Sequence, residues 1–147
     1  MPEKQTIRKA RQDKREGKSP STQAGEFVHE EIEHIREGKH GARSTKQAIA
    51  IGLSKARRAG VKLSAPKKGT ASASTRKQAQ HDLAAAKTHH KPSPRRSRAS
   101  REALKDAPRS VASSAALSHQ AKSSARKRGA TSRHNAAVKA ARTRAAH

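Results

Sequence analysis

Two histidines separated by glutamates are the first residues in this chain whose types could do chemistry. His29 and His34 enclose three glutamates and one isoleucine, which is similar to the zinc-binding helix of metalloproteases. That helix needs histidines four residues apart, so that both lie on one face. Here the histidines are five apart and would point in different directions. We therefore interpret them as surface histidines and expect no metal site and no catalytic site.

A second motif, Gly-Lys-Ser at residues 17–19, matches the end of a phosphate-binding loop. Such a loop also needs a glycine where this chain has Gln12, and it follows a β-strand. Neither condition is met, so residues 17–19 are better explained as the end of one helix and the start of the next. The serines elsewhere lie in a segment without a fixed base beside them, and catalysis needs fixed positions. We expect a protein that is not an enzyme and uses no cofactor.

The third motif, Ser-Pro-Arg-Arg at residues 93–96, is a turn followed by two cations. The pattern is known from histone tails, where it presents arginines to narrow A/T-rich minor grooves, whose negative potential attracts them. The alternative is a chance tetrapeptide in a segment rich in serine and arginine.

Composition argues against a large hydrophobic core. The 147 residues include 35 Lys and Arg, 11 Asp and Glu, one Phe, and no Tyr, Trp or Cys, for a net charge of +24. Buried apolar area stabilises a fold by roughly 25 cal/mol per Å², and ordering the backbone costs about 1–2 kcal/mol per residue. Low hydrophobicity with high net charge is typical of disorder, or of order gained on binding.

Several protein classes are excluded by the same composition. A chain without cysteine forms no disulfide framework and no thiolate metal site. The sequence has no run of about 18 apolar residues that would span a membrane, and its first residues lack the apolar stretch of a secretory signal, so we expect neither. We expect a cytoplasmic protein that attracts phosphate polymers.

Charge divides the chain into segments. Residues 1–18 carry a net charge of +4, residues 19–38 carry −4, residues 39–69 carry +9, and residues 70–147 carry +15. The acidic segment is therefore followed by two strongly basic ones.

Three helices are predicted in the first sixty residues. The first runs from Glu3 to Glu16 and stops at Gly17. The second is opened by a serine cap and a proline at residues 19–20 and runs to residue 37. The third covers residues 45–59, after a capping box in which a serine and a glutamine at residues 44 and 47 would satisfy each other's backbone donors.

Helices two and three each carry one apolar stripe and should pair as an antiparallel hairpin. The acids of helix two would cover its other side, and the acidic helix would face the basic one. Small residues on helix three would allow close approach. The stripes are Ala24, Phe27, Val28, Ile32 and Ile35 on helix two, and Ala48, Ile49, Gly52, Leu53 and Ala56 on helix three.

The remainder is rich in Ala, Ser, Lys and Arg and lacks a stripe wide enough to dock. Its alanine-rich stretches 76–88, 110–128 and 133–146 favour helix, but isolated helices of this length are marginal. We expect them to be disordered until phosphates neutralise them. The predicted fold class is all-α: a small helical hairpin or three-helix N-terminal region followed by a largely disordered or conditionally helical basic tail. The segments would be an N-terminal helix or arm (1–18), the hairpin (19–62) and the tail (63–147).

These features predict a largely sequence-nonspecific, histone-like DNA-binding protein of the nucleoid that contacts the phosphate backbone. Binders of single strands and of RNA commonly stack bases on aromatic side chains, and only Phe27 is present. DNA is thus favoured over RNA, with a second copy of the chain as a candidate partner through the hairpin. The residues predicted to contact DNA are Lys46, Lys55, Arg57, Arg58, Lys62, Lys67, Lys68, Arg95, Arg96, Arg98, Arg126, Lys127, Arg128, Arg142 and Arg144.

Two stretches carry a resemblance: SPSTQAGEFV at residues 19–28 and GKHGARSTKQAIAIGLSKARRAG at residues 38–60. Together they resemble a family of small basic bacterial proteins without an assigned function, some labelled DNA-binding or plasmid-stabilisation proteins. The resemblance covers residues 3–69 and implies a bacterial source. Residues beyond it resemble, in composition only, the tails of bacterial linker-histone-like proteins, with more Arg and Ser than those tails usually have.

Four alternatives remain open. The charge could serve solubility alone, although that needs a net charge of only about 2–8. The basic helices could bind a membrane surface, but they lack the large apolar residues for it. The protein could associate with RNA or the ribosome, or the hairpin could be a protein-interaction module in plasmid maintenance.

Overall fold

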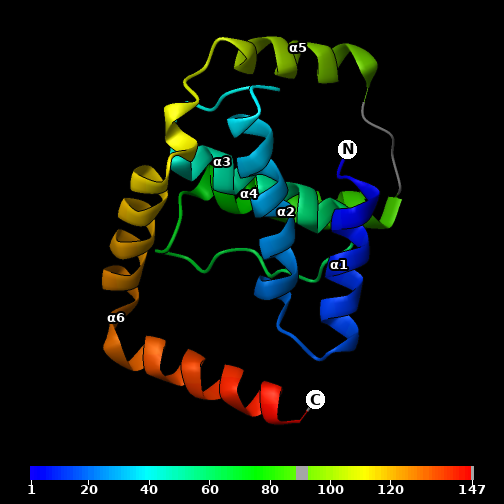
Figure 1. The fold of residues 1–147 in the computed structure, drawn as a ribbon. Helices are drawn as coiled ribbons and strands as arrows, with labels where there is room; N and C mark the ends of the chain where they lie inside the picture. Colours follow the sequence, from blue (N-terminus) through cyan, green and yellow to red (C-terminus); the bar gives the residue numbers. More distant parts are fainter. Residues whose placement is uncertain (89–92, 147) are drawn as a thin grey trace.

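The protein is all-helical throughout the part of the chain that the computed structural model describes, residues 1–88 and 93–146. Six α-helices and one short 3-10 helix lie in these ranges (Figure 1). Their bounds are α1 Lys4–Arg15, α2 Pro20–Arg36, α3 Thr45–Arg58, α4 Ala73–Thr88, α5 Pro94–Lys105, η1 Ser110–Ala112 and α6 Ser114–Ala145.

Local signals set the ends of the first three helices, and the predicted positions are confirmed to within one or two residues. Ser19 caps α2 by accepting from the N–H of Thr22 at 3.4 Å. Ser44 caps α3 by accepting from the N–H of Gln47 at 3.1 Å. The reciprocal half of the capping box is wrong, because the Gln47 side chain accepts from the N–H of Arg43, one residue before the cap.

Helices α1 and α2 run antiparallel, side by side, whereas α3 crosses behind α2 at a steep angle (Figure 1). The predicted antiparallel pairing of α2 with α3 is therefore wrong in its angle. The predicted close approach is correct: a Cβ on Gly52 would lie 2.6 Å from the Cα of Val28. A glycine at the crossing brings two backbones together at one point, which favours a crossing over a long parallel seam.

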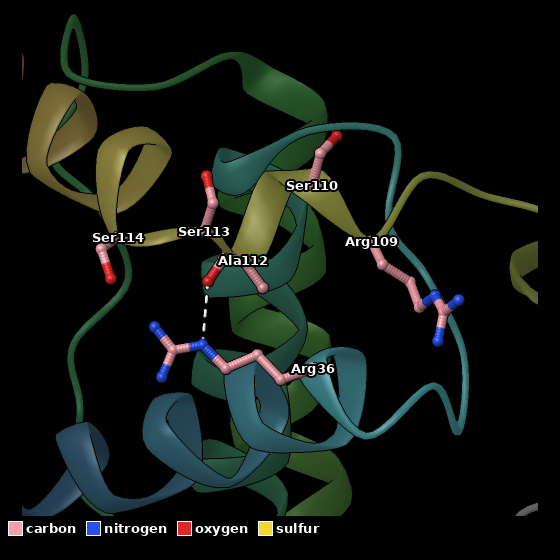
Figure 2. A pocket seen from close by; sticks show the side chains of 6 residues that line it. All are labelled: Arg36, Arg109, Ser110, Ala112, Ser113 and Ser114. Atoms are coloured by element: carbon pink, nitrogen blue, oxygen red, sulfur yellow. Dashed lines mark hydrogen bonds between the residues drawn. The ribbon is translucent and has the colours of Figure 1, made fainter.

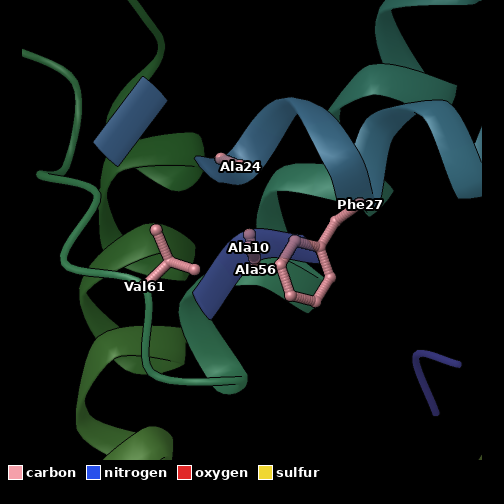
Figure 3. Close-up of a cluster of buried hydrophobic side chains, with 5 residues drawn as sticks. All are labelled: Ala10, Ala24, Phe27, Ala56 and Val61. Atoms are coloured by element: carbon pink, nitrogen blue, oxygen red, sulfur yellow. The ribbon is translucent and has the colours of Figure 1, made fainter. Parts of the chain in front are cut away.

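Two small clusters form the core. In the first, Phe27 of α2 packs with one alanine from each of α1, α2 and α3 and with a valine three residues beyond the end of α3; its members are Ala10, Ala24, Phe27, Ala56 and Val61 (Figure 3). The second gathers around the other end of α2, with members Ile32, Ile35, Ala42, Ala48 and Ala112. The apolar stripes of α2 and α3 are thus largely buried by contacts within the chain.

The acidic side chains of α2 do not all cover its outer side, contrary to the sequence analysis. Glu30 and Glu31 are 6% and 0% exposed. Glu30 was expected to be solvated, and its Oε2 instead accepts from the N–H of Glu3 at 3.0 Å, at the start of α1.

The predicted fold class is wrong for the tail. Helices α4, α5 and α6 replace the largely disordered segment expected after residue 62. Docking needs no wide stripe here: α4 packs on α3 with Ala79 3% and Asp82 1% exposed. Ala112 of the 3-10 helix is fully buried and packs in the second core cluster. Small side chains permit close packing without the large aliphatic residues that the prediction required.

Helix α6 is broken within its length. Gly129 has a backbone conformation of φ 76° and ψ 166°, which is not helical and which residues with a Cβ adopt with strain. The helix changes direction there (Figure 1). No residue of α5 or α6 is buried. Apart from Leu117 near the start of α6, which packs against the second core cluster, these helices extend from the packed part of the molecule as arms.

Candidate nucleic-acid interface

Lys55, a predicted DNA contact, lies against the acidic helix. Its Nζ is 2.6 Å from Oε2 of Glu31 and 3.6 Å from Oε1 of Glu30, and its side chain is 23% exposed. The expected attraction between the acidic and the basic helix is thus carried by a largely buried ion pair. Removing one partner of such a pair leaves an uncompensated charge in the interior. Lys55 therefore holds α3 to α2.

Arg57 is also occupied inside the fold. It is 7% exposed, and its guanidinium donates to the carbonyls of Leu63 at 3.2 Å and Ser64 at 3.4 Å. Burial lowers the pKa of Arg57, and the charge of Asp82 opposes this shift. Arg57 thereby fixes the chain that leaves α3.

Arg58 connects α3 to α4. Its Nε donates to Oδ1 of Asp82 at 2.8 Å, and the Ser54 hydroxyl donates to Oδ2 at 2.6 Å. Gln78 of α4 adds a third hydrogen bond to the same carboxylate at 3.0 Å. Asp82 is one of only three acids after residue 69, and this one holds α4 in place. The side chain of Arg58 remains 48% exposed.

The other predicted contacts of the first seventy residues face solvent. Lys46 on α3 and Lys62, Lys67 and Lys68 after it are exposed. None of the four forms an ion pair with a residue of the described ranges 1–88 and 93–146. They are available to an external anion.

The arms carry the remaining predicted contacts, and all of these are exposed. Within the described part of the chain, none of these side chains forms an ion pair. They are Arg95, Arg96 and Arg98 on α5, and Arg126, Lys127, Arg128, Arg142 and Arg144 on α6.

Two cations of α5 were missed by sequence reasoning. Arg101 and Lys105 are exposed and follow Arg98 at helical spacings of three and seven, so the three share one face. Glu102 lies next to this face and reduces its charge. The helical spacing was already visible in the sequence, but it carries meaning only once residues 94–105 are known to be a helix.

The start of α6 is tied to the packed helices by hydrogen bonds to backbone carbonyls. Arg36, at the end of α2, donates through Nε to the carbonyl of Ala112 at 2.9 Å (Figure 2). Its Nη1 donates to Glu33 at 2.9 Å. The hydroxyl of Thr45 donates to the carbonyl of Val111 at 2.8 Å. These bonds fix the position from which the α6 arm leaves.

An open groove lies beside this junction, lined by Arg36, Arg109, Ala112 and three serines (Figure 2). Ser113 caps α6 by accepting from the N–H of Ala116 at 3.2 Å. The Arg109 side chain points away from Arg36 (Figure 2). The two guanidinium groups therefore do not converge on one anion, and the groove is part of the anchor of α6.

Acidic side chains gather on the opposite side of α2, in a groove between α1 and α2. In Figure 1, α1 and α6 lie on opposite sides of α2. The glutamates that line the groove are Glu3, Glu26, Glu30, Glu33 and Glu37. Charge is thus divided between a side with acids and arms that are almost purely basic.

The fold defines a class of small helical proteins with a packed centre and exposed basic helical arms. A family of unknown function (DUF6496) matches residues 21–69, which contain α2, α3 and the segment after α3. The match covers a third of the chain and none of α4, α5 or α6. No curated protein matches the chain, and no solved structure matches it. None of the helices in the described ranges has both the length and the apolar character needed to cross a membrane.

Proposed function

We propose that the protein binds duplex DNA through the phosphate backbone, without catalysis and with little sequence preference. The observation that supports this most is the set of exposed arginines and lysines on α5 and α6, which have no acidic partner among the described residues. Neutralising phosphates releases counterions and gives affinity without base readout. Such a protein would associate with the chromosome and behave as a nucleoid component.

The arms change the expected mode of contact. A disordered polycation would follow DNA along its length, whereas a helix holds its cations at fixed spacing. Helices α5 and α6 lack buried residues, so contact with DNA removes little packing. The single aromatic residue, Phe27, is 1% exposed and is not accessible for base stacking, which favours a duplex over a single strand.

The direct test is binding of the full-length protein to random-sequence duplex DNA, titrated with salt. We expect the logarithm of the binding constant to fall linearly with the logarithm of the salt concentration. The slope should be roughly −0.9 per phosphate neutralised, which amounts to several units in total. Binding that is absent at low ionic strength would overturn the proposal. Tighter binding to structured RNA in direct competition would replace DNA with RNA as the partner.

Matched triple variants locate the interface. Replacing Arg126, Lys127 and Arg128 with Gln removes three charges from α6. The magnitude of the salt-dependence slope should therefore decrease by up to about 2.7. The control replaces Lys4, Arg8 and Arg11 with Gln, three exposed cations of α1. If the slope decreases equally in the two variants, net charge alone governs DNA binding and the arms are not the interface.

A further inference from the structure

Three potential metal ligands from neighbouring parts of the fold lie close together. Glu31 and His34 are on α2, and His40 is in the loop between α2 and α3. One ligand atom from each lies within 4.8 Å of the other two. His29, the other histidine of the sequence motif, is exposed and not in this cluster, whereas His34, expected at the surface, is half-buried.

The local backbone explains why these three meet. Glu31 and His34 are three residues apart and so share a face of α2. Gly38 ends the helix with a φ of 77° and reverses the chain, which returns His40 to the same face. The rings of His34 and His40 meet edge to face, with centroids 6.4 Å apart.

The spacing of Glu31 and His40 and the burial of the carboxylate suit a metal ion, while Nε2 of His34 lies 3.1 Å from Oε1 of Glu3. Oε1 of Glu31 lies 3.3 Å from Nε2 of His40, and two ligands of a tetrahedral zinc ion with bonds of about 2.0–2.1 Å are roughly 3.4 Å apart. The side chain of Glu31 is 1% exposed, while those of His34 and His40 are 14% and 16% exposed. The carboxylate is thus interior and the imidazoles border solvent, which leaves an entry path.

The hydrogen bonding of His40 points in the same direction. Its Nδ1 lies 3.1 Å from the carbonyl oxygen of Gly41, and because that oxygen can only accept, Nδ1 carries a proton. With Nδ1 held in this way, Nε2 is the nitrogen of His40 that would coordinate a metal ion beside Oε1 of Glu31. Oε1 of Glu31 has no hydrogen-bond donor among the described residues, whereas Oε2 is paired with the Lys55 ammonium at 2.6 Å. A metal ion between Nε2 of His40 and Oε1 of Glu31 would give this oxygen a partner, and a histidine anchored by a carbonyl is typical of metal ligands.

We infer that Glu31, His34 and His40 bind one divalent transition-metal ion of the zinc class. Two imidazoles and one carboxylate are a known ligand set for Zn²⁺ and leave a fourth position for water. Imidazole suits zinc far better than magnesium, which prefers oxygen ligands. The ion would fasten the loop after α2 to the helix itself. The site is separate from the basic arms and does not depend on DNA binding.

Calorimetric titration of the full-length, metal-free protein with Zn²⁺ alone, without DNA, tests this inference. We expect one strong site in the wild type, and affinity at least about tenfold weaker in His34→Gln and in His40→Gln. His29→Gln is the matched control, because it removes an exposed histidine of the same helix, and it should bind as the wild type does. Equal affinity in all four proteins, or no stoichiometric binding to the wild type, would overturn the site.

Two further readouts distinguish a built site from scattered surface binding. Zn²⁺ should raise the Tm of the wild type and of His29→Gln, and should leave the Tm of His34→Gln and His40→Gln nearly unchanged, with circular dichroism first establishing that each variant folds. Mg²⁺ at the same concentration should have no effect. If Mg²⁺ raises the Tm as much as Zn²⁺ does, the acidic groove is binding cations by charge alone and the inference fails.

Discussion

Helices α1–α4 and helices α5 and α6 are helical for different reasons. Each of the first four buries residues against a neighbour, so tertiary contacts stabilise it. In α5 and α6 no residue is buried, although Leu117 near the start of α6 packs against the second core cluster; beyond that contact, helix formation there depends mainly on local propensity. One chain thus holds a stability-determining part and a charge-presenting part. Changes of apolar residues should matter in the first part, and changes of charge should matter in the second.

The largest difference between the two parts should come from truncating core residues. Phe27→Ala removes the only aromatic side chain, 1% exposed, and should lower the free energy of unfolding by about 3–5 kcal/mol. Val138→Ala on α6 should change it by less than about 0.5 kcal/mol. Urea denaturation measures both. Comparable losses would mean that α6 is packed as firmly as α2.

The crossing of α2 and α3 gives the next largest effect. A Cβ on residue 52 would lie only 2.6 Å from the Cα of Val28. Gly52→Val therefore forces the two helices apart and should lower the free energy of unfolding by about 1–3 kcal/mol or more. Gly25→Ala is the control within α2, since nothing lies within 4 Å of its Cβ, and it should stabilise the helix by about 0.5–1 kcal/mol. Thermal unfolding compares them, and a tolerated Gly52→Val would contradict the close crossing.

The docking of α4 should show an intermediate effect. Asp82→Asn weakens the bonds from Arg58, Ser54 and Gln78 and should cost about 1–3 kcal/mol. Glu102→Gln, on the exposed α5, should be nearly neutral. Hydrogen exchange should show faster exchange in α4 of the Asp82 variant, with α1 and α2 unchanged. Unchanged exchange in α4 would mean that Ala79 alone suffices to hold it.

The smallest effect concerns ion pairs at the end of α1, where Lys18 contacts the buried Asp13 and the half-buried Glu16. Hydrogen bonds from Lys18 to Asp13 and Glu16 raise the pKa of Lys18 above its ordinary value of 10.5. A raised lysine pKa contributes stability below the unfolded value, and that stability is lost as pH rises through the folded value. The small difference in the free energy of unfolding between the wild type and Lys18→Gln should therefore be constant from pH 6 to pH 10. Lys14→Gln is the control, and a difference that vanishes below pH 10 would contradict the shift.

Helix positions in the first sixty residues could be predicted because their signals are local. Ser19 and Ser44 act as caps within three residues of their partners, and Gly52 marks a close contact by its size alone. The prediction for the tail is wrong because it required large aliphatic residues for a helix to pack against the rest of the fold. Ala79, Asp82 and Ala112 dock through size and hydrogen bonds, and neither property produces a periodic pattern.

The candidate sites divide in the same way. Exposed cations such as Arg95 and Arg126 could be named from the sequence, since a charge without a nearby acid in the sequence is usually solvated. That Lys55 and Arg57 face inward depends on Glu31 and on two carbonyls, which only the folded chain brings near them. Likewise, no spacing rule joins Glu31 and His34 to His40 across the turn at Gly38.

By itself, the sequence determined the charge of the chain, the positions of the first three helices and the stripes that pair them, because each depends on residues within a few positions of one another. The tertiary structure decided which cations are left for a partner, how α3 crosses α2, and that the tail is helical. Those outcomes depend on contacts between residues far apart in the chain, such as Arg58 with Asp82 and Arg36 with Ala112. A long-range contact depends on three-dimensional proximity, which composition and periodicity do not record.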